Sequence, residues 1–222
     1  MKWNKLYNYP KTVRSSVDGT RKYEVGNEKL PSVTTIISGT QSEEKAESLA
    51  RWKQRVGEVE ADRIKNTAAL RGTAMHTYLE HYLDGTGYKD LTTLGKQAEV
   101  MANKIIESGL GDLEELWGLE TTLYYPDLYA GATDVVGIYA GQPAIIDFKQ
   151  SNKPKKEEWI EDYYLQLGAY SLAHNVVYNS RITQGIVLLC TVDNLFQDFR
   201  IQGEKLEEYQ NKFLEKVEQY YY

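Results

Sequence analysis

The alternation of apolar and polar residues divides the chain into a helical front part and a strand-rich centre. Residues 42–70 are charged, and their apolar positions follow a helical pattern. Three later runs are instead rich in β-branched and aromatic residues, and short turn sequences separate them. Because connections this short join antiparallel neighbours, we expect adjacent strands at 117–125, 129–139 and 143–149.

The pattern outside this centre predicts further helices and strands. At residues 71–73 the long helical pattern resets, and Thr73 is suited to cap a new helix that runs to about Asp84. The apolar stripe of this helix comprises Met75, Tyr78, Leu79, Tyr82 and Leu83. More helices are expected at 94–108, at 154–175 and from Gly203 onward, and more strands at 182–191 and 195–202. This order of helix, three strands, helix and two strands predicts an α/β sandwich.

The beginning of the chain is polar and rich in tyrosine. Turn signals at Asp18-Gly19 and Gly26-Asn27 flank the alternating run TRKYEV, so we expect a hairpin there. Residues 31–38 form a short β-branched run that begins with proline.

Composition narrows the class of protein without changing this outline. The chain has 222 residues, which suits one domain of generous size, and its net charge of −6 excludes a general polycation. Nucleic-acid binding would therefore need a local basic groove or metal ions. The single cysteine, Cys190, excludes an intramolecular disulfide framework and indicates a reducing compartment, the cytoplasm. No apolar run is long enough to span a membrane, so no membrane association is expected.

The run Pro143–Ser151 carries the first candidate chemistry. Asp147 and Lys149 lie two apart on a predicted strand and therefore point to the same face. Asp134 lies thirteen residues before Asp147, a spacing that can bring two carboxylates together on neighbouring strands. Two such oxygens, with the carbonyl of Phe148 as a third, suit Mg²⁺ or Mn²⁺. Lys149 would orient or deprotonate a water, or neutralise charge on a phosphate. The alternative is two acids near the surface and a salt-bridged lysine.

Two residues upstream are further candidates for metal ligands. His76 lies off the apolar stripe of its helix, and Glu80 follows one turn later on the same face. The imidazole is a candidate ligand, although a single histidine on a helix is more often structural. Glu120, in the strand that enters the sheet, is either a ligand, a support for one, or an edge-strand glutamate without such a role.

The helix that follows the three strands offers a surface for substrate. Gln166 and Tyr170 are four residues apart and share a face with Tyr163 and Trp159. A polar and aromatic face opposite the core suits contact with a phosphate or a base. A solvated face with ordinary tyrosines is the alternative.

Basic residues gather in two segments. Four lysines in one expected loop form the densest basic run of the chain: Lys149, Lys153, Lys155 and Lys156. Beside the candidate site they would bind the phosphates of a DNA strand, or else line a solvated loop. Residues 51–55 form a basic and aromatic cluster in which Trp52 either stacks on a base or anchors a core. Arg71, near His76, is expected to contact a phosphate or to bridge Glu120.

Five elements in this order resemble the PD-(D/E)xK nuclease superfamily, in its RecB-type exonuclease branch. They are RGTAMH, Glu120, GATD, DFK and QLGAY, and they span about residues 71–190. The resemblance implies a core of helix, three antiparallel strands, helix and strand, with helices flanking a mixed sheet. The upstream runs PSVTTIIS and ARWKQRVG are similar to mitochondrial genome-maintenance exonucleases and their phage relatives, which extends the resemblance to about 31–190. The first acid follows threonine instead of proline, a departure from the superfamily's name.

The resemblance also implies roles for single residues. It implies a metal-dependent phosphodiesterase site made of His76, Asp134, Asp147 and Lys149. Gln166 and Tyr170 would orient the site and the DNA, and Ser151 matches a position that keeps a small hydroxyl residue. Residues 1–70 would be an extension of hairpin and helix that guides DNA, and 71–222 the nuclease core, within one compact unit. An iron–sulfur subgroup needs four cysteines, so a cluster is excluded here.

These inferences predict an Mg²⁺- or Mn²⁺-dependent DNA exonuclease that prefers single-stranded ends and acts in replication, recombination or repair. DNA is the expected partner, together with a recombination or replication protein, and a phage protein would act in the host cytoplasm. Two alternatives stay open. One is a structure-selective endonuclease on the same core, and the other is a non-catalytic DNA-binding recombination partner, against which the intact acids and lysine speak.

Overall fold

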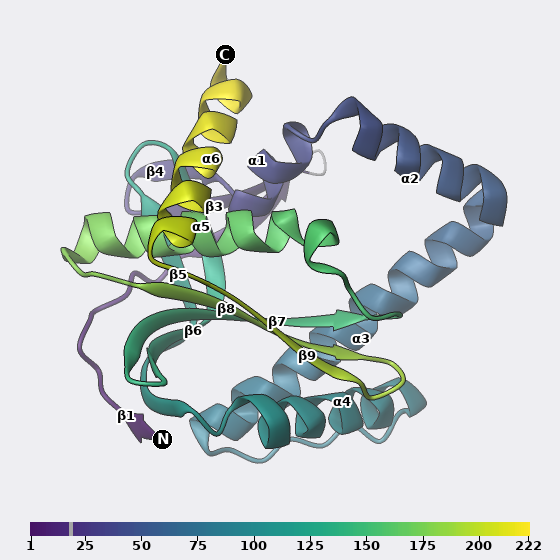
Figure 1. Cartoon of the computed structure of the whole chain (residues 1–222), viewed down its shortest axis with the longest axis horizontal. Helices are drawn as coiled ribbons and strands as arrows, with labels where there is room; N and C mark the ends of the chain where they lie inside the picture. The colour runs from purple at the N-terminus through teal and green to yellow at the C-terminus, as the bar shows by residue number, and fades with distance from the viewer. Residues whose placement is uncertain (18–19) are drawn as a thin grey trace.

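The computed structural model describes residues 1–17 and 20–222, with helices on both faces of a central sheet (Figure 1). The helices of this part are α1 (Val33–Gly39), α2 (Glu43–Val56), α3 (Glu58–Asp84), α4 (Thr93–Gly109), η1 (Glu157–Trp159), α5 (Glu161–Tyr178) and α6 (Glu204–Tyr221). The strands are β1 (Lys2–Trp3), β2 (Val13–Val17), β3 (Thr20–Val25), β4 (Glu28–Pro31), β5 (Leu113–Tyr125), β6 (Tyr129–Tyr139), β7 (Gln142–Ser151), β8 (Gln184–Thr191) and β9 (Phe196–Gln202). The α/β class expected from the sequence is confirmed.

The central sheet of the described residues has the strand order β1-β5-β6-β7-β8-β9. β5, β6 and β7 are antiparallel neighbours, as their short turns predicted. β7 and β8 run parallel, and α5 crosses between them, so the sheet is mixed. This is the order of helix, three strands, helix and strand that the resemblance implied.

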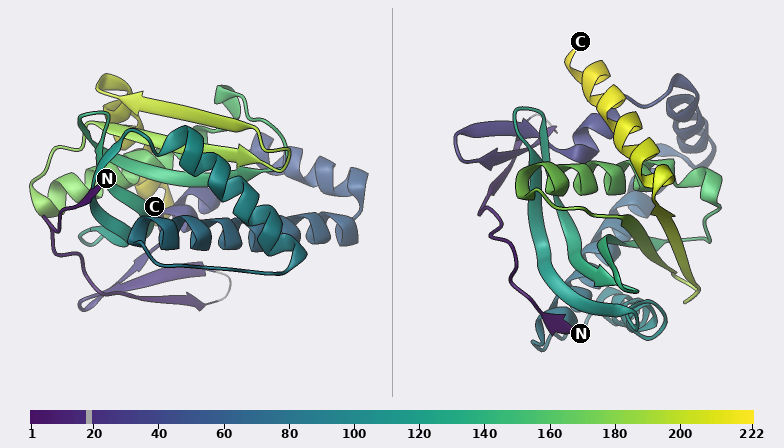
Figure 2. Two further views of the ribbon diagram at one scale, coloured as in Figure 1. Left: turned by 90° about the horizontal axis from the view of Figure 1, so that it is seen from below. Right: turned by 60° about the vertical axis from the view of Figure 1, so that its left-hand side comes forward.

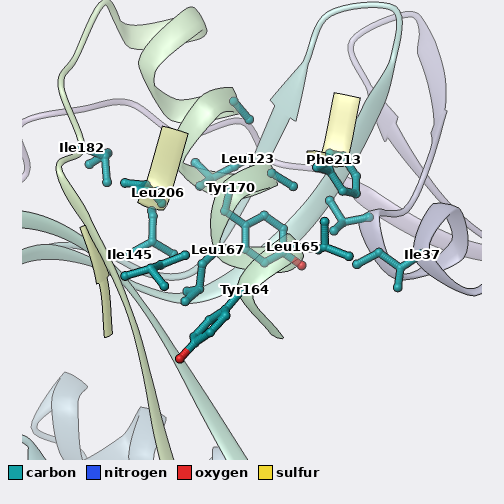
Figure 3. Close-up of a cluster of buried hydrophobic side chains, with 14 of the residues drawn as sticks. Ile37, Leu123, Ile145, Tyr164, Leu165, Leu167, Tyr170, Ile182, Leu206 and Phe213 are labelled. Carbon is teal, nitrogen blue, oxygen red and sulfur yellow. The ribbon is translucent and has the colours of Figure 1, made fainter. Parts of the chain in front are cut away.

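Two hydrophobic cores lie on the two faces of this sheet. Figure 2 shows the helices that cover these faces. α3 and α4 cover one face with side chains such as Met75 and Ile105. α1, α5 and α6 cover the other face, where Tyr164, Tyr170 and Phe213 belong to one buried cluster (Figure 3). α5 therefore lies between the sheet and α6, and both of its broad faces are covered.

The beginning of the chain forms a second sheet, β2-β3-β4, in place of a single hairpin. Its apolar side packs on Ala130 of β6. The turn expected at Asp18-Gly19 lies outside the described residues, whereas Gly26 has a φ of 59° in the turn between β3 and β4. Most of the β-branched run at 31–38 is helix α1, because Ser32 caps it by accepting a hydrogen bond from a backbone amide of the first turn.

The predicted reset of the helix at residues 71–73 is wrong. α3 is unbroken there, and Thr73 donates its hydroxyl to the Ala69 carbonyl at 3.1 Å instead of capping a new helix. The break lies earlier, at Gly57, whose φ of 87° favours glycine. The boundary expected between residues 70 and 71 therefore falls inside one helix.

Two smaller expectations about helices also need correction. Tyr82 was expected in the apolar stripe of α3 but is 51% exposed, whereas the other members of that stripe are buried. The helix expected from residue 154 begins later, at Glu161, after the short turn η1. Trp159 lies in η1 and is 59% exposed, so it does not share the helix of Gln166.

Within the described residues, no helix combines the length and the apolar character needed to cross a membrane.

Gly168 allows a test of the close contact between α5 and α6. A Cβ at this position would lie 2.6 Å from the backbone carbonyl carbon of Tyr209, so one of the helices would have to move. We expect Gly168→Ala to lower the free energy of unfolding by about 1–3 kcal/mol, measured by urea denaturation. Gly111→Ala is the matched control, since a Cβ there has nothing within 4 Å. Equal stability of the two variants would contradict the close contact.

Candidate active site

Three carboxylates lie at one level across β5, β6 and β7. The β5–β6 register places Glu120 opposite Asp134. The β6–β7 ladder stops at Val135, so Asp134 and Asp147 occupy the next facing position. Beyond this point β7 pairs only with β8, and the amide of Phe148 has no ladder partner on β6. The Asp134 carboxylate accepts a hydrogen bond from that amide at 2.5 Å, which satisfies it.

α3 brings His76 to this carboxylate row, which comprises Glu120, Asp134 and Asp147. The Nδ1 of His76 lies 2.9 Å from Asp134 Oδ1. Burial alone would lower the pKa of His76, but the Asp134 carboxylate outweighs this and raises the pKa to about 9. Although burial also opposes ionisation of Asp134, the imidazole holds the pKa of that carboxyl below its ordinary value. The two side chains therefore form an ion pair.

Glu120 joins His76 and Asp134 in a candidate metal-binding group. One ligand atom from each of the three residues lies within 4.8 Å of the others. Glu120 has a φ of 47°, which is uncommon for a residue with a side chain. The residue as a whole is exposed, but a carboxyl oxygen lies within 4.8 Å of ligand atoms of His76 and Asp134, and the carboxyl group is partly desolvated. This loss of water, followed by the effect of Asp134, raises the pKa of Glu120 to about 8.

Lys149 forms an ion pair with Asp147, as their spacing on one strand predicted. Its ammonium also donates to Gln166 Oε1 at 3.2 Å and lies 5.3 Å from the ring centre of Tyr163. Burial disfavours the ammonium, but the carboxylates of Asp147 and Asp134 outweigh this and keep the pKa of Lys149 above its ordinary value. Two elements, β7 and α5, therefore hold Lys149 as a cation beside the carboxylate row.

The residues of the site fit a divalent cation. The Oδ2 atom of Asp147 is buried, and the Lys149 ammonium is in direct contact with it. Burial raises the pKa of Asp147, so an additional positive charge would favour its ionised form. Carboxylate oxygens with one imidazole are ligands suited to Mg²⁺ or Mn²⁺. The carbonyl of Phe148 stays a predicted ligand.

Tyr170 lies within the hydrophobic core. It is 4% exposed and belongs to the buried cluster that α5 forms with the sheet (Figure 3). Gly131 leaves room for its ring, since a Cβ there would lie 2.8 Å from Tyr170 Cε1. Burial, followed by the charge of Asp147, raises the pKa of Tyr170 well above its ordinary value. The face expected on α5 is therefore divided, because Gln166 contacts Lys149 whereas Tyr170 is packed inside.

Arg71 does not bridge Glu120, contrary to one expectation. It is buried, and its guanidinium donates to Gln150 at 2.9 Å and to Asn152. Gln150 in turn donates to the Ala68 carbonyl at 3.0 Å, so these residues fasten α3 to the end of β7. Sequence reasoning missed Gln150 and Asn152. Their closeness to the DFK triplet was the one signal that pointed to them.

The basic loop, residues 153–156, is anchored at both ends. Ser151 donates its hydroxyl to the Lys153 carbonyl at 2.7 Å. The backbone of Lys155 exchanges two hydrogen bonds with the side chain of Gln197, at 2.7 and 2.9 Å. Lys153 and Lys156 are exposed. The loop follows β7 directly, so its lysines begin at the β7 end of the carboxylate row.

Trp52 lies on an arm instead of in a core. No residue of α2 is buried, and Leu49 and Trp52 line a hollow of about 630 Å³ together with two arginines. Lys45, near the start of α2, forms an ion pair with Asp162 of α5 at 2.5 Å. This contact ties the arm to the helix that carries Gln166. Figure 1 shows α2 and α3 extending together from the body of the molecule.

The relatives found by comparison with known proteins and described below are all named exonucleases. No family model matches the sequence. The chain is 30% identical to mitochondrial genome maintenance exonuclease 1 of Xenopus tropicalis over 211 residues, which cover 88% of this chain and 58% of that protein. It is 27% identical to the Mus musculus protein of the same name over 229 residues, which cover 97% of this chain and 67% of that protein. A solved structure from Eubacterium rectale, named a candidate exonuclease, has a TM-score of 0.49 and 14% identity over 69% of this chain and 67% of that one. The chain thus spans 58% of the length of the Xenopus relative.

The contacts of Arg71 predict that it stabilises the fold. Arg71→Ala leaves Gln150 and Asn152 without their charged donor, so we expect the free energy of unfolding to fall by about 2–3 kcal/mol, measured by chemical denaturation. Arg63→Ala on the same helix is the control, because Arg63 pairs with Glu60 at the exposed surface and such pairs contribute little. If the two variants lose the same stability, Arg71 does not anchor α3.

Proposed function

The chain belongs to the PD-(D/E)xK superfamily, in its RecB-like branch, and on that premise we propose that it is a metal-dependent DNA exonuclease. One observation carries this proposal. The row of Glu120, Asp134 and Asp147 has His76 bonded to its centre and Lys149 at one end. A structural ion-pair network has no need of a third, partly desolvated carboxylate beside two that already have a cationic partner each.

The arrangement supplies the parts of metal-assisted phosphodiester hydrolysis. The groups that would hold Mg²⁺ or Mn²⁺ are His76, Glu120, Asp134 and Asp147, with the Phe148 carbonyl as a further oxygen. Because a ligand must be deprotonated, His76 and Glu120, whose pKa values are raised, would release their protons on binding. When bound, the cation supplies positive charge to the phosphate and favours ionisation of the attacking water. Asp134 cannot turn away from the site, because the amide of Phe148 and the His76 imidazole both hold its carboxylate.

Lys149 fits one of the three roles that the sequence left open. Its pKa lies above the ordinary value, so it is a poor base at neutral pH. As a fixed cation it neutralises the charge that develops on the phosphate oxygens during attack. Gln166 accepts a hydrogen bond from Lys149, and the Tyr163 ring lies beside the same ammonium, so both residues orient it. Tyr170 is proposed to act indirectly, because its buried ring packs α5, the helix of Gln166, against the sheet.

The DNA would approach along the basic and aromatic surfaces around this row. Lys153, Lys155 and Lys156 are proposed to contact phosphates, and Ser151 to keep their loop in place. Trp52 is proposed to stack on a base in the hollow of α2, which favours a single strand because a paired base is not free to stack there. Arg71 contributes mainly by holding α3 to β7.

The names of the relatives support the biological setting. They are exonucleases of mitochondrial genome maintenance, which favours a role in DNA replication, recombination or repair for this chain as well. A recombination or replication protein as partner remains part of the proposal. The alternative of an endonuclease on the same core has the same site, so it differs only in whether a free end is needed.

Lys149→Ala separates catalysis from metal binding. We expect the rate of cleavage of labelled single-stranded DNA with Mn²⁺ to fall by about 10²–10³-fold, because a fixed charge next to the reacting phosphate is lost. Mn²⁺ binding, measured by isothermal titration calorimetry, should persist in this variant and be lost in Asp134→Ala. Lys96→Ala, at an exposed position of α4, is the control and should resemble the unaltered protein. Full activity in both Lys149→Ala and Asp134→Ala would end the assignment.

The need for a free end distinguishes the exonuclease from its alternatives. We expect linear single strands to be degraded and covalently closed circles of the same sequence to survive, measured by gel electrophoresis with Mn²⁺. A chelator should abolish the reaction. Cleavage of closed circles would favour the endonuclease. Binding that is indifferent to chelator, with no product at all, would favour the non-catalytic DNA-binding protein.

A further inference from the structure

A polar groove adjoins the carboxylate row at its β5 end. The groove encloses about 510 Å³, a volume within the range of about 300–1,000 Å³ that small-molecule sites occupy. Its lining comes from the segment before β2, from β2 and β3, and from β5 and β6: Tyr9, Pro10, Lys11, Thr12, Arg14, Tyr23, Glu120, Thr121, Thr122 and Ala132. Glu120 is thus shared between this groove and the candidate metal-binding group.

The N-terminal wall of the groove is fixed in place. Thr12 and Thr122 share a hydrogen bond between their hydroxyls at 2.7 Å, and the Tyr9 hydroxyl lies 3.1 Å from a ring nitrogen of His174. A Cβ on Gly118 would lie 2.7 Å from the Tyr9 ring, so glycine there lets the segment pack directly on β5. The groove therefore exists before any ligand arrives, and little conformational freedom is lost on binding.

The charge of the groove suits an anion. Lys11 and Arg14 are exposed on its rim, and neither enters an ion pair among the described residues. Glu120 is the one acidic residue of the lining, and it belongs to the candidate metal-binding group. The Thr121 hydroxyl, which takes no part in the contacts of the N-terminal wall, supplies a further hydrogen-bond donor. In a chain with a net charge of −6, two such cations beside a catalytic row favour a phosphate ligand.

The position of the groove relative to the carboxylate row indicates which phosphate of a DNA strand it would bind. The carboxylate row crosses from β5 to β7, and the basic loop 153–156 begins at the β7 end. A strand that is cut in the middle of the row must continue on both sides of the scissile phosphate. The basic loop serves one side, and this groove is the basic feature at the other end.

We propose that the groove binds the nucleotide that adjoins the scissile phosphate on the side away from the basic loop, with Lys11 and Arg14 contacting a phosphate of that nucleotide. This inference rests on the proposed nuclease function and extends it to a second part of the substrate. It makes the N-terminal segment and β2 part of the DNA-binding surface.

The test reverses both charges in a Lys11→Glu/Arg14→Glu variant. We expect KM for a labelled single-stranded oligonucleotide to rise about tenfold or more, with kcat largely unchanged, because only binding is affected. Loss of two phosphate contacts should also reduce the slope of log(kcat/KM) against log[salt] by about 1.4. The matched control is Lys96→Glu/Arg181→Glu, which makes the same charge change at exposed positions outside the groove and should show smaller effects on both.

Two further measurements keep the result interpretable. Lys11→Ala/Arg14→Ala, checked by thermal unfolding, should show the same trend if the charge-reversed variant folds poorly. Bis(p-nitrophenyl) phosphate is too small to reach the groove and should be hydrolysed equally by all variants. An active protein whose groove variants match the control in KM and salt slope would overturn this inference and leave the nuclease proposal intact. If the unaltered protein cleaves nothing, the nuclease proposal fails. The affinity for an oligonucleotide, measured by fluorescence anisotropy, then tests the groove separately. Equal affinities of the groove variants and the control variants would overturn the inference about the groove.

Discussion

The structure depends on the compensation of several charges that are removed from water at one point of the sheet. Asp134 is buried at the place where β6 and β7 stop pairing, and its carboxylate accepts from the Phe148 amide and pairs with His76. Removing one partner of such a group leaves the others uncompensated, which is strongly destabilising. The same contacts fasten α3 to the sheet. The side chains that form the site therefore also fix the position of a long helix.

Glycines make the approach of the surrounding elements possible. Gly131, three residues before Asp134, faces the ring of Tyr170, and Gly168 faces the backbone of α6. Parts of the GATD and QLGAY sequences therefore serve packing, although both sequences also carry residues of the site. Tyr170 belongs to the packing part, since it is buried among apolar side chains.

The positive charge that could attract DNA is confined to short segments of the chain. With a net charge of −6, the chain as a whole repels a polyanion, so attraction must come from short basic segments and from a bound cation. The basic loop at 153–156, the arm of α2 and the rim of the N-terminal groove come from three separate parts of the sequence. The loop follows the strand that carries Asp147, the arm contacts the helix that carries Gln166, and the groove contains Glu120 of the carboxylate row.

The sequence by itself predicted that Asp134 and Asp147 lie together and left the role of Glu120 open. Short turns after Tyr125 and Tyr139 fix the registers of β5, β6 and β7, and those registers place Glu120, Asp134 and Asp147 at one level. Only the tertiary structure decided what surrounds the row. His76 reaches Asp134 across 58 residues, and the Thr12–Thr122 contact that builds the groove spans 110. Helix period and turn chemistry act over a few residues, so they predict elements and registers. The partners of Arg71 and the burial of Tyr170 depend instead on how distant elements pack together.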